Sequence, residues 1–515
     1  MSVVRGALVK FGIRAYDKIK RTKKASELLQ RNVLKKLLNR ASSTAFGQQY
    51  QFDSITKSTD FIKVFQETVP LHDYDKIFDE WWHRLLRGEA NICWPGKVAY
   101  FGLSSGTAGD SSKYVPVTDD MLKSMRRASA NVFRGSLKLN FPVSFYGRQF
   151  LFLGGCTKLK EENGLYFGDI SGINTAIGVP SWLEDITKPG KAISDIENWD
   201  DRLQAIVKEA PKWDLCCICG IPSWLQLMIE RIVAHYKINT IHDIWPNLEV
   251  YVGGGISFDP YRKRFSQFTA RSLRFIDTYY TSEGYLACQQ NFNSQQSPMK
   301  LFLNNGLFFE FIPFDDNNFP NGSLAEQATC LTIGEIEENV DYALVLSTCA
   351  GAWRYRIGDT IRFVNKETAE IVITGRTKHF LNVCGEHLSV DNMNQGILRL
   401  EQFFGASMPE FTVKAVGIGN HFEHHWYIGC DKLNLNEKKV AEKLDQFLAE
   451  LNDDYQTERR DNLLRSIQVK LLPLSTFFDW QAGQGKLGGQ NKFPRVMRDE
   501  LFEDWKAFLT TKGLI

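Results

Sequence analysis

The residues best suited to chemistry in this sequence form a run of hydroxyls and glycines that ends on a lysine. The run, residues 104–113, reads SSGTAGDSSK. Glycines let a backbone approach a ligand closely, while hydroxyls, turn N–H groups and a lysine supply donors and charge for a polyphosphate. It is not a Walker A loop, because GxxxxGK[ST] is absent and Lys113 follows Ser112. A plain surface loop is the alternative.

Two acidic residues follow predicted strands in segments that suit a nucleotide. Glu283 lies in YYTSEGY, residues 279–285, where it is placed to hold Mg²⁺ against phosphate while a tyrosine stacks on a base. Asp359 ends WRYRIGD, residues 353–359, and a carboxylate in a turn after a strand accepts both hydroxyls of a ribose. A solvated loop glutamate and an ordinary Gly-Asp turn are the alternatives.

A second glycine-rich segment, GQGKLGGQNKFPRV at residues 483–496, carries Lys486 and Lys492. A mobile loop can carry such a lysine into an active site as a counter-charge to phosphate, whereas an isolated lysine is normally solvated. Each of the four segments is weak evidence alone.

Apolar runs of strand length alternate with helical patterns through most of the chain. We expect strands at 98–103, 149–155, 248–255, 275–280, 307–313 and 343–348, and helices at 74–87, 118–133, 196–209 and 222–236. This alternation predicts an α/β fold with mainly parallel sheets and flanking helices, whose ligands gather at the carboxyl ends of strands. The loop at 104–113 would then stand between a strand and a helix. Near Gly375 the pattern changes to a small α+β unit of roughly 140 residues.

Residues 1–45 have the apolar spacing of helices, and their polar positions are mostly basic. We favour helices packed on their own domain with a solvated face, and a membrane-surface helix is the alternative.

Composition narrows the class of protein. The 515 residues are enough for two or three domains, and a net charge of +2 gives no bulk argument for nucleic acid or an anionic membrane. We expect no transmembrane segment and no secretory signal, because cations interrupt the first apolar run. We interpret Cys216, Cys217 and Cys219 as reduced buried thiols rather than a zinc site. We interpret the histidines of HFEHHW (His421, His424 and His425) as exposed strand-end residues rather than metal ligands.

In order, the four segments closely resemble the auxin-responsive acyl-acid amido synthetases, the plant hormone-conjugating family of the adenylate-forming superfamily. Members look like SSGT…K, YxSSE, YRxGD and QxKxPR, which here are residues 104–113, 279–283, 355–359 and 490–495. The resemblance covers nearly the whole chain. Ala108 stands where the family usually has serine, and GRTKHFLNVCGEHLS resembles general adenylate-forming enzymes, so we expect a non-plant member.

The resemblance implies roles for particular residues. Phosphate oxygens would be held by Ser104, Ser105, Gly106 and Thr107, with Lys113 at the end of the loop. The adenine would be bordered by Gly253, Gly254 and Gly255, stacked on Tyr279 and close to Tyr285. Around the reacting phosphate would stand Ser282 on the α-phosphate, Glu283 on Mg²⁺, Asp359 on the ribose, Arg376 in the hinge beside the nucleotide, and Lys492 as the mobile catalytic lysine of the C-terminal domain.

The function implied is that of a cytoplasmic, ATP- and Mg²⁺-dependent ligase. It would turn a carboxylic acid into an acyl-adenylate and pass the acyl group to an amine, in particular that of an amino acid. Residues 1–375 would bind ATP and acid, and residues 376–515 would form a mobile domain. The acyl pocket is expected between residues 170–182 and 221–225. Three points stay open: an acyl-CoA ligase, a non-catalytic nucleotide- or membrane-surface-binding protein, and the oligomeric state, a monomer included.

Overall fold

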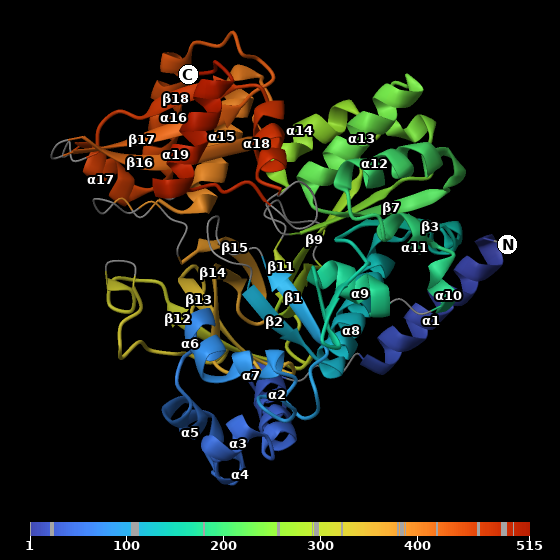
Figure 1. The fold of residues 1–515 in the computed structure, drawn as a ribbon, viewed down its shortest axis with the longest axis vertical. Coiled ribbons are helices and arrows are strands. Elements are labelled where there is room, and N and C mark those ends of the chain that lie inside the picture. Colours follow the sequence, from blue (N-terminus) through green and yellow to red (C-terminus); the bar gives the residue numbers. More distant parts are fainter. Residues whose placement is uncertain are drawn as a thin grey trace.

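The computed structural model describes most of the chain (Figure 1). Outside the described residues lie 1, 21–24, 105–112, 179–180, 255–257, 291, 293–297, 321–322, 378–380, 382–385, 387, 419–420, 461–463, 486–491 and 498.

An eleven-stranded mixed sheet forms the centre of the large N-terminal part. Its strands, in spatial order, are β12 (Leu307–Pro313), β13 (Asp341–Thr348), β14 (Tyr355–Asn365), β15 (Glu370–Arg376), β11 (Met299–Leu301), β10 (Gly284–Gln289), β9 (Arg274–Thr281), β8 (Val250–Gly254), β7 (Leu215–Gly220), β3 (Gln149–Leu153) and β6 (Thr187–Lys188). From β9 to β6 neighbouring strands are parallel, and from β12 to β9 they are antiparallel. The predicted α/β class is confirmed, but the sheet is mixed rather than mainly parallel.

Connection length explains the difference between the two halves. In the parallel half, a helix separates β7 from β8 and β8 from β9: α13 (Pro222–Tyr236) and α14 (Asp259–Gln267). A parallel pair needs such a crossover, whereas strands joined by a few residues can only turn back on themselves. Between the end of β9 and the end of β15, the residues that the structure describes run from strand to strand without an α-helix.

Helices α12 (Trp199–Glu209), α13 and α14 cover the parallel half and share one apolar core with it. Proline begins α13, where its missing N–H costs no helical hydrogen bond. The carboxyl ends of β3, β7 and β8 meet in register, with Leu153 beside Gly220 and Gly220 beside Gly253. Gly253 is in turn beside Asp277, midway along β9. The expected strand-end edge is therefore present.

The loop at 105–112 connects two strands instead of a strand and a helix. β1 (Tyr100–Ser104) and β2 (Lys113–Val117) form an antiparallel hairpin in a separate four-stranded sheet. Only after β2 does α8 (Asp119–Ser136) begin, capped by the Thr118 hydroxyl, which accepts the N–H of Met121. The expected order of strand, loop and helix is corrected in this respect, because the tyrosine- and valine-rich run after the loop is a strand.

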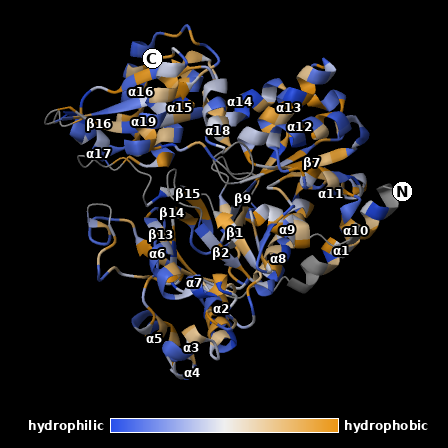
Figure 2. Ribbon diagram, viewed as in Figure 1, coloured by the Kyte–Doolittle hydropathy of each residue, from blue (hydrophilic) through white to orange (hydrophobic). Residues whose placement is uncertain are grey.

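The C-terminal part has its own sheet and its own core. The sheet consists of β16 (Glu410–Ile418), β17 (His421–Gly429) and β18 (Gln468–Leu472), and α15 (Val390–Phe404) and α16 (Glu437–Leu451) pack together on it. Figure 2 shows α16 with hydrophobic positions among hydrophilic ones, as a half-buried helix requires. This confirms the α+β character that the sequence predicts after Gly375.

Two smaller predictions have different outcomes. The cysteines in the described part of the chain are free thiols, as expected. The prediction of exposed histidines is wrong for His424, whose side chain is buried and lies 3.1 Å from the carboxylate of the equally buried Glu386. Within the described residues no helix is long and apolar enough to span a membrane, and no group of three or more His, Cys, Asp or Glu residues is arranged to hold a metal ion.

Candidate functional site

A two-residue turn presents Ser282 and Glu283 between β9 and β10. Thr281 and Gly284 are paired across the hairpin, so the turn is as short as an antiparallel pair allows. Ser282 is buried and Glu283 is half-buried. Burial raises the pKa of Glu283, and the nearby carboxylate of Asp359 raises it further. A cation bound beside the turn would therefore stabilise the ionised form of Glu283.

Asp359 is the centre of a compact polar cluster. Its Oδ1 lies 2.9 Å from Nε of Arg376, and its Oδ2 accepts a 2.6 Å hydrogen bond from the Tyr279 hydroxyl. Burial and the Asp359 carboxylate raise the pKa of Tyr279 well above its usual value, so this hydroxyl stays a donor. Each carboxylate oxygen keeps a free lone-pair direction, so both can accept a further hydroxyl.

Sheet register, rather than a turn, positions Asp359. The residue lies inside β14, directly opposite Arg376 on β15. We expected it in a turn after a strand, which is corrected here. Gly358 has a φ of 84°, open to glycine but rare for other residues, and its carbonyl accepts the N–H of Thr377. The glycine deforms the strand locally without ending it.

Lys492 reaches this cluster from the C-terminal part of the chain. Lys492 is exposed to solvent. The protein atoms that crowd its ammonium group and the Arg376 guanidinium nevertheless lower its pKa to about 8, while Asp359 works in the opposite direction. The lysine therefore lies within electrostatic range of two N-terminal residues far from it in sequence.

Two sets of contacts hold the segment that follows Lys492 in place. The Phe493 ring packs into an aromatic cluster with Phe477, Trp480 and Trp505. Two residues later Arg495 donates to the Glu410 carboxylate at 2.8 Å, and its backbone carbonyl accepts the N–H of a β16 residue. The lysine thus sits at the end of a fixed segment.

A cross-domain contact continues from Arg495. The hydroxyl of Tyr261, on α14 of the N-terminal part, donates to the other oxygen of Glu410, and Arg495 Nη2 lies 3.5 Å from that hydroxyl. Tyr261 and Glu410 are buried, and burial raises the pKa of Tyr261. We call Tyr261, Glu410 and Arg495 the interdomain latch. Sequence reasoning missed it because Tyr261 and Glu410 are 149 residues apart.

Lys113, which follows the loop in the chain, lies beside an aromatic side chain. Lys113 is paired with Ser104 across the hairpin, and its Nζ lies 5.2 Å from the ring centre of Tyr74. Tyr74 and Glu283 both influence the pKa of Tyr355, which burial raises first. Tyr74 therefore links Lys113 to the surroundings of Tyr355. Ser105, Gly106 and Thr107 lie outside the described residues, as do Gly255 and Lys486.

Close packing explains two of the predicted glycines. A Cβ at Gly254 would lie 2.6 Å from the carbonyl oxygen of Thr278 on β9, and one at Gly253 would collide with the Tyr251 hydroxyl. Tyr285 pairs with Tyr280 across the hairpin and packs edge-on against it and Phe302, on the face opposite Tyr279. Its proximity to an adenine stays a prediction.

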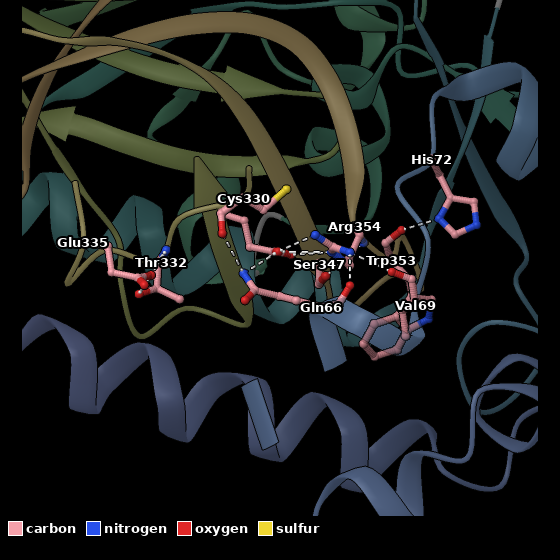
Figure 3. A network of polar contacts seen from close by, with 10 residues as sticks. Gln66, Val69, His72, Cys330, Thr332, Glu335, Ser347, Trp353 and Arg354 are labelled. Atoms are coloured by element: carbon pink, nitrogen blue, oxygen red, sulfur yellow. Dashed lines mark hydrogen bonds and ion pairs between the residues drawn. The ribbon is translucent and has the colours of Figure 1, made fainter. Parts of the chain in front are cut away.

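A buried arginine that sequence reasoning left without a role fixes the start of β14 (Figure 3). Arg354 lies 3.1 Å from the carboxylate of Glu310, and both side chains are almost fully buried. Its Nη1 donates to the carbonyls of Gln66 and Val69 at 2.6 and 2.7 Å. The network ties β12, β14 and the N-terminal helices together five residues before Asp359. The signal available in the sequence was an arginine between two aromatic residues, Trp353 and Tyr355, within a motif.

Two surface hollows lie elsewhere. One of about 680 Å³ lies between α2 (Ser26–Ala41) and α8, and one of about 840 Å³ lies beside Arg354. Neither is lined by Glu283, Tyr279 or Asp359. The candidate site is therefore located by the contacts among its side chains and not by either of these two hollows.

Solved structures share this architecture. The GH3.15 acyl acid amido synthetase superposes with a TM-score of 0.75 at 15% identity, over 94% of this chain and 93% of that one. A 2-hydroxyisobutyryl-CoA ligase, in the postadenylation state with 2-HIB-AMP, gives a TM-score of 0.60 at 12% identity, over 94% and 92%. At such low identities the likeness establishes the fold alone, which is the one that these two enzymes share.

Similar sequences point the same way. A jasmonoyl–L-amino acid synthetase, JAR4 of Nicotiana attenuata, is 21% identical over 92% of both chains. The indole-3-acetic acid-amido synthetase GH3.4 of Arabidopsis thaliana is 22% identical over 50% of this chain and 45% of its own. The models of the GH3 family N-terminal, central and C-terminal domains match residues 15–205, 300–376 and 391–501. This chain is therefore a member of the GH3 family, as its motifs predicted.

Proposed function

We propose that this chain is an acyl-acid amido synthetase that uses ATP to join a carboxylic acid to the amine of an amino acid. The observation that carries the proposal is the convergence of Lys492 on the Asp359–Arg376 pair, beside the turn that holds Glu283. A ribose-binding carboxylate, a metal-binding carboxylate and a movable cation are the parts that adenylation needs.

In the first half-reaction the carboxylate of the acid attacks the α-phosphorus of ATP, giving an acyl-adenylate and pyrophosphate. Asp359 accepts the ribose hydroxyls while Tyr279 and Arg376 hold its orientation. Protonated Lys492 offsets negative charge on the phosphate oxygens. In the second half-reaction an amine attacks the acyl carbon, AMP leaves, and an amide is formed with loss of a proton.

Mg²⁺ fits the donor set at the β9–β10 turn. The ion prefers one or two carboxylates with phosphate oxygens completing its shell. Glu283 is a carboxylate whose pKa is raised by burial and by the nearby Asp359 carboxylate, although Arg376 acts in the opposite direction. Asp359 is already paired with Arg376. When bound, Mg²⁺ would neutralise phosphate charge, with Glu283 as its protein ligand.

The free thiols are those of a protein in a reducing compartment, so we place the enzyme in the cytoplasm.

We infer that residues 377–515 move as a unit against the rest of the chain, one residue beyond the boundary predicted from the sequence, because Arg376 is paired with Asp359 inside the large sheet. The moving part has its own sheet and core and contributes Lys492 to a site built by the other part. Rotation would remove Lys492 once the adenylate has formed and admit the amine.

The experiment is acid-dependent ATP–pyrophosphate exchange across a panel of aryl, indolyl and aliphatic acids, without amine or coenzyme A. We expect exchange with one class of acid. Amide formation is then compared with thioester formation by offering amino acids or coenzyme A to the loaded enzyme. A protein that binds ATP but exchanges with none of the acids contradicts the proposal, and thioester formation alone would favour the CoA ligase alternative.

A further inference from the structure

Helix α1 (Ser2–Lys20) is held on the large domain by one of its faces. A Cβ at Gly6 would collide with the carbonyl oxygen of Val143, so the two backbones touch. Val9 and Ile13 pack against an apolar cluster of the parallel half of the sheet. We had favoured a helix packed on its own domain, and this face confirms that part of the prediction.

The opposite face of α1 is apolar as well, although a solvated polar face was expected. Leu8 is 69% exposed and Phe11 is 73% exposed, the two highest values among the large apolar side chains that the structure describes. Ala15 is also exposed and, at helical spacing, continues the same stripe. Exposed apolar stripes next to charge mark interaction surfaces.

Positive charge borders the stripe. Arg5 and Arg14 lie on either side of it, each turned by about 90° around the helix axis. Only Asp17 is acidic among residues 1–24, whereas the basic residues there are Arg5, Lys10, Arg14, Lys18, Lys20, Arg21, Lys23 and Lys24. Figure 1 shows α1 at the outer edge of the molecule, on the side away from the C-terminal domain, where a flat surface can approach it.

We propose that the outward face of α1 docks this protein on an anionic lipid bilayer. Leu8 and Phe11 enter the boundary between headgroups and acyl chains, and the neighbouring arginines contact lipid phosphates and carboxylates. A second copy of the chain is a poorer occupant, because two such helices face to face would bring like charges together. The site of adenylation is not involved, so the inference does not rest on the proposed function.

The test is flotation of the full chain with two kinds of vesicle, phosphatidylcholine alone and phosphatidylcholine mixed with phosphatidylserine. We expect flotation with the anionic vesicles only, reduced at high salt. The variant Leu8→Gln/Phe11→Gln removes the stripe while keeping residues of good helix propensity, and it should lose most of the flotation. The matched control is Phe403→Gln/Leu433→Gln, which removes two side chains, each 50% exposed, from the C-terminal part and should float like the parent.

Acid-dependent pyrophosphate exchange and the melting temperature of each variant, measured without vesicles, should stay at the parent's values. The proposal is overturned if the parent does not float with anionic vesicles, or if the two double variants float equally well. It is also overturned if the parent sediments as a dimer that Leu8→Gln/Phe11→Gln converts to a monomer, which would make the stripe an interface between copies.

Discussion

The two sides of the candidate site are built in different ways. On the N-terminal side, Asp359, Arg376 and Glu283 stand on neighbouring strands or a two-residue turn, so sheet register fixes their distances. On the C-terminal side, Lys492 depends on an aromatic anchor at Phe493 and on the interdomain latch. We call the N-terminal side the permanent half of the site and the C-terminal side, with Lys492, its detachable half. A permanent half suits the binding of the adenosine part of ATP, which both half-reactions share. A C-terminal part that moves, as proposed above, would suit a cation that is needed only in the first half-reaction.

The largest effect should come from the network behind the permanent half. Glu310→Gln leaves Arg354 buried without its counter-charge, which costs about 3–5 kcal/mol of unfolding free energy. Urea denaturation measures this. Glu503→Gln, which breaks an exposed pair with Lys506, should cost under about 0.5 kcal/mol. Equal losses in the two variants would show that Arg354 does not organise this part of the sheet.

Removing the carboxylate of the permanent half should weaken ATP binding itself. Asp359→Asn should raise the Kd for a non-hydrolysable ATP analogue about 10- to 100-fold, as expected when hydrogen bonds to a charged group are lost. Asp341→Asn is the control, because Asp341 forms a similar pair with Arg362 at another position of β13 and β14. Calorimetry that finds equal affinities for the two variants would remove Asp359 from the ribose site.

The charge of Lys492, in the detachable half, should make the rate of adenylation depend on pH. Lys492, with a pKa of about 8 in the free enzyme, is protonated below that pH and loses its charge above it. The kcat/KM for ATP in pyrophosphate exchange should therefore fall about tenfold per pH unit well above pH 8. Lys492→Arg keeps its charge and should flatten this limb even if its rate is lower. A falling limb that persists unchanged in that variant would assign the pKa to another group.

The smallest effect is expected from the interdomain latch. Tyr261→Phe removes one buried hydrogen bond across the domains, about 1 kcal/mol, and should slow adenylation about fivefold without slowing amide formation from a supplied adenylate. The matched control Tyr455→Phe removes a buried hydrogen bond to Asp445 inside the C-terminal part. If both variants slow both half-reactions alike, the Tyr261 contact is merely structural.

The sequence predicted features that depend on neighbouring residues better than features that depend on tertiary packing. Glu283 and Asp359 could be named as candidates because short motifs keep their chemistry within a few residues, and their roles stay predictions. The parallel half was predicted because its apolar runs are separated by helices. The antiparallel half, the buried Glu386–His424 pair and the Tyr261–Glu410 contact were missed or misplaced, because each depends on residues brought together by tertiary packing. Asp359 itself was expected in a turn, since only pairing with both neighbouring strands reveals β14 as continuous.

The most direct test of the two-sided site is to measure both half-reactions separately in Lys492→Ala. Exchange of pyrophosphate into ATP reports adenylation, and single-turnover amide formation from a chemically supplied acyl-adenylate reports the second step. The account predicts a loss of about 10²- to 10³-fold in the first and at most a few-fold in the second, because the lysine balances phosphate charge only while pyrophosphate departs. Equal losses in both half-reactions would contradict a cation that leaves between them.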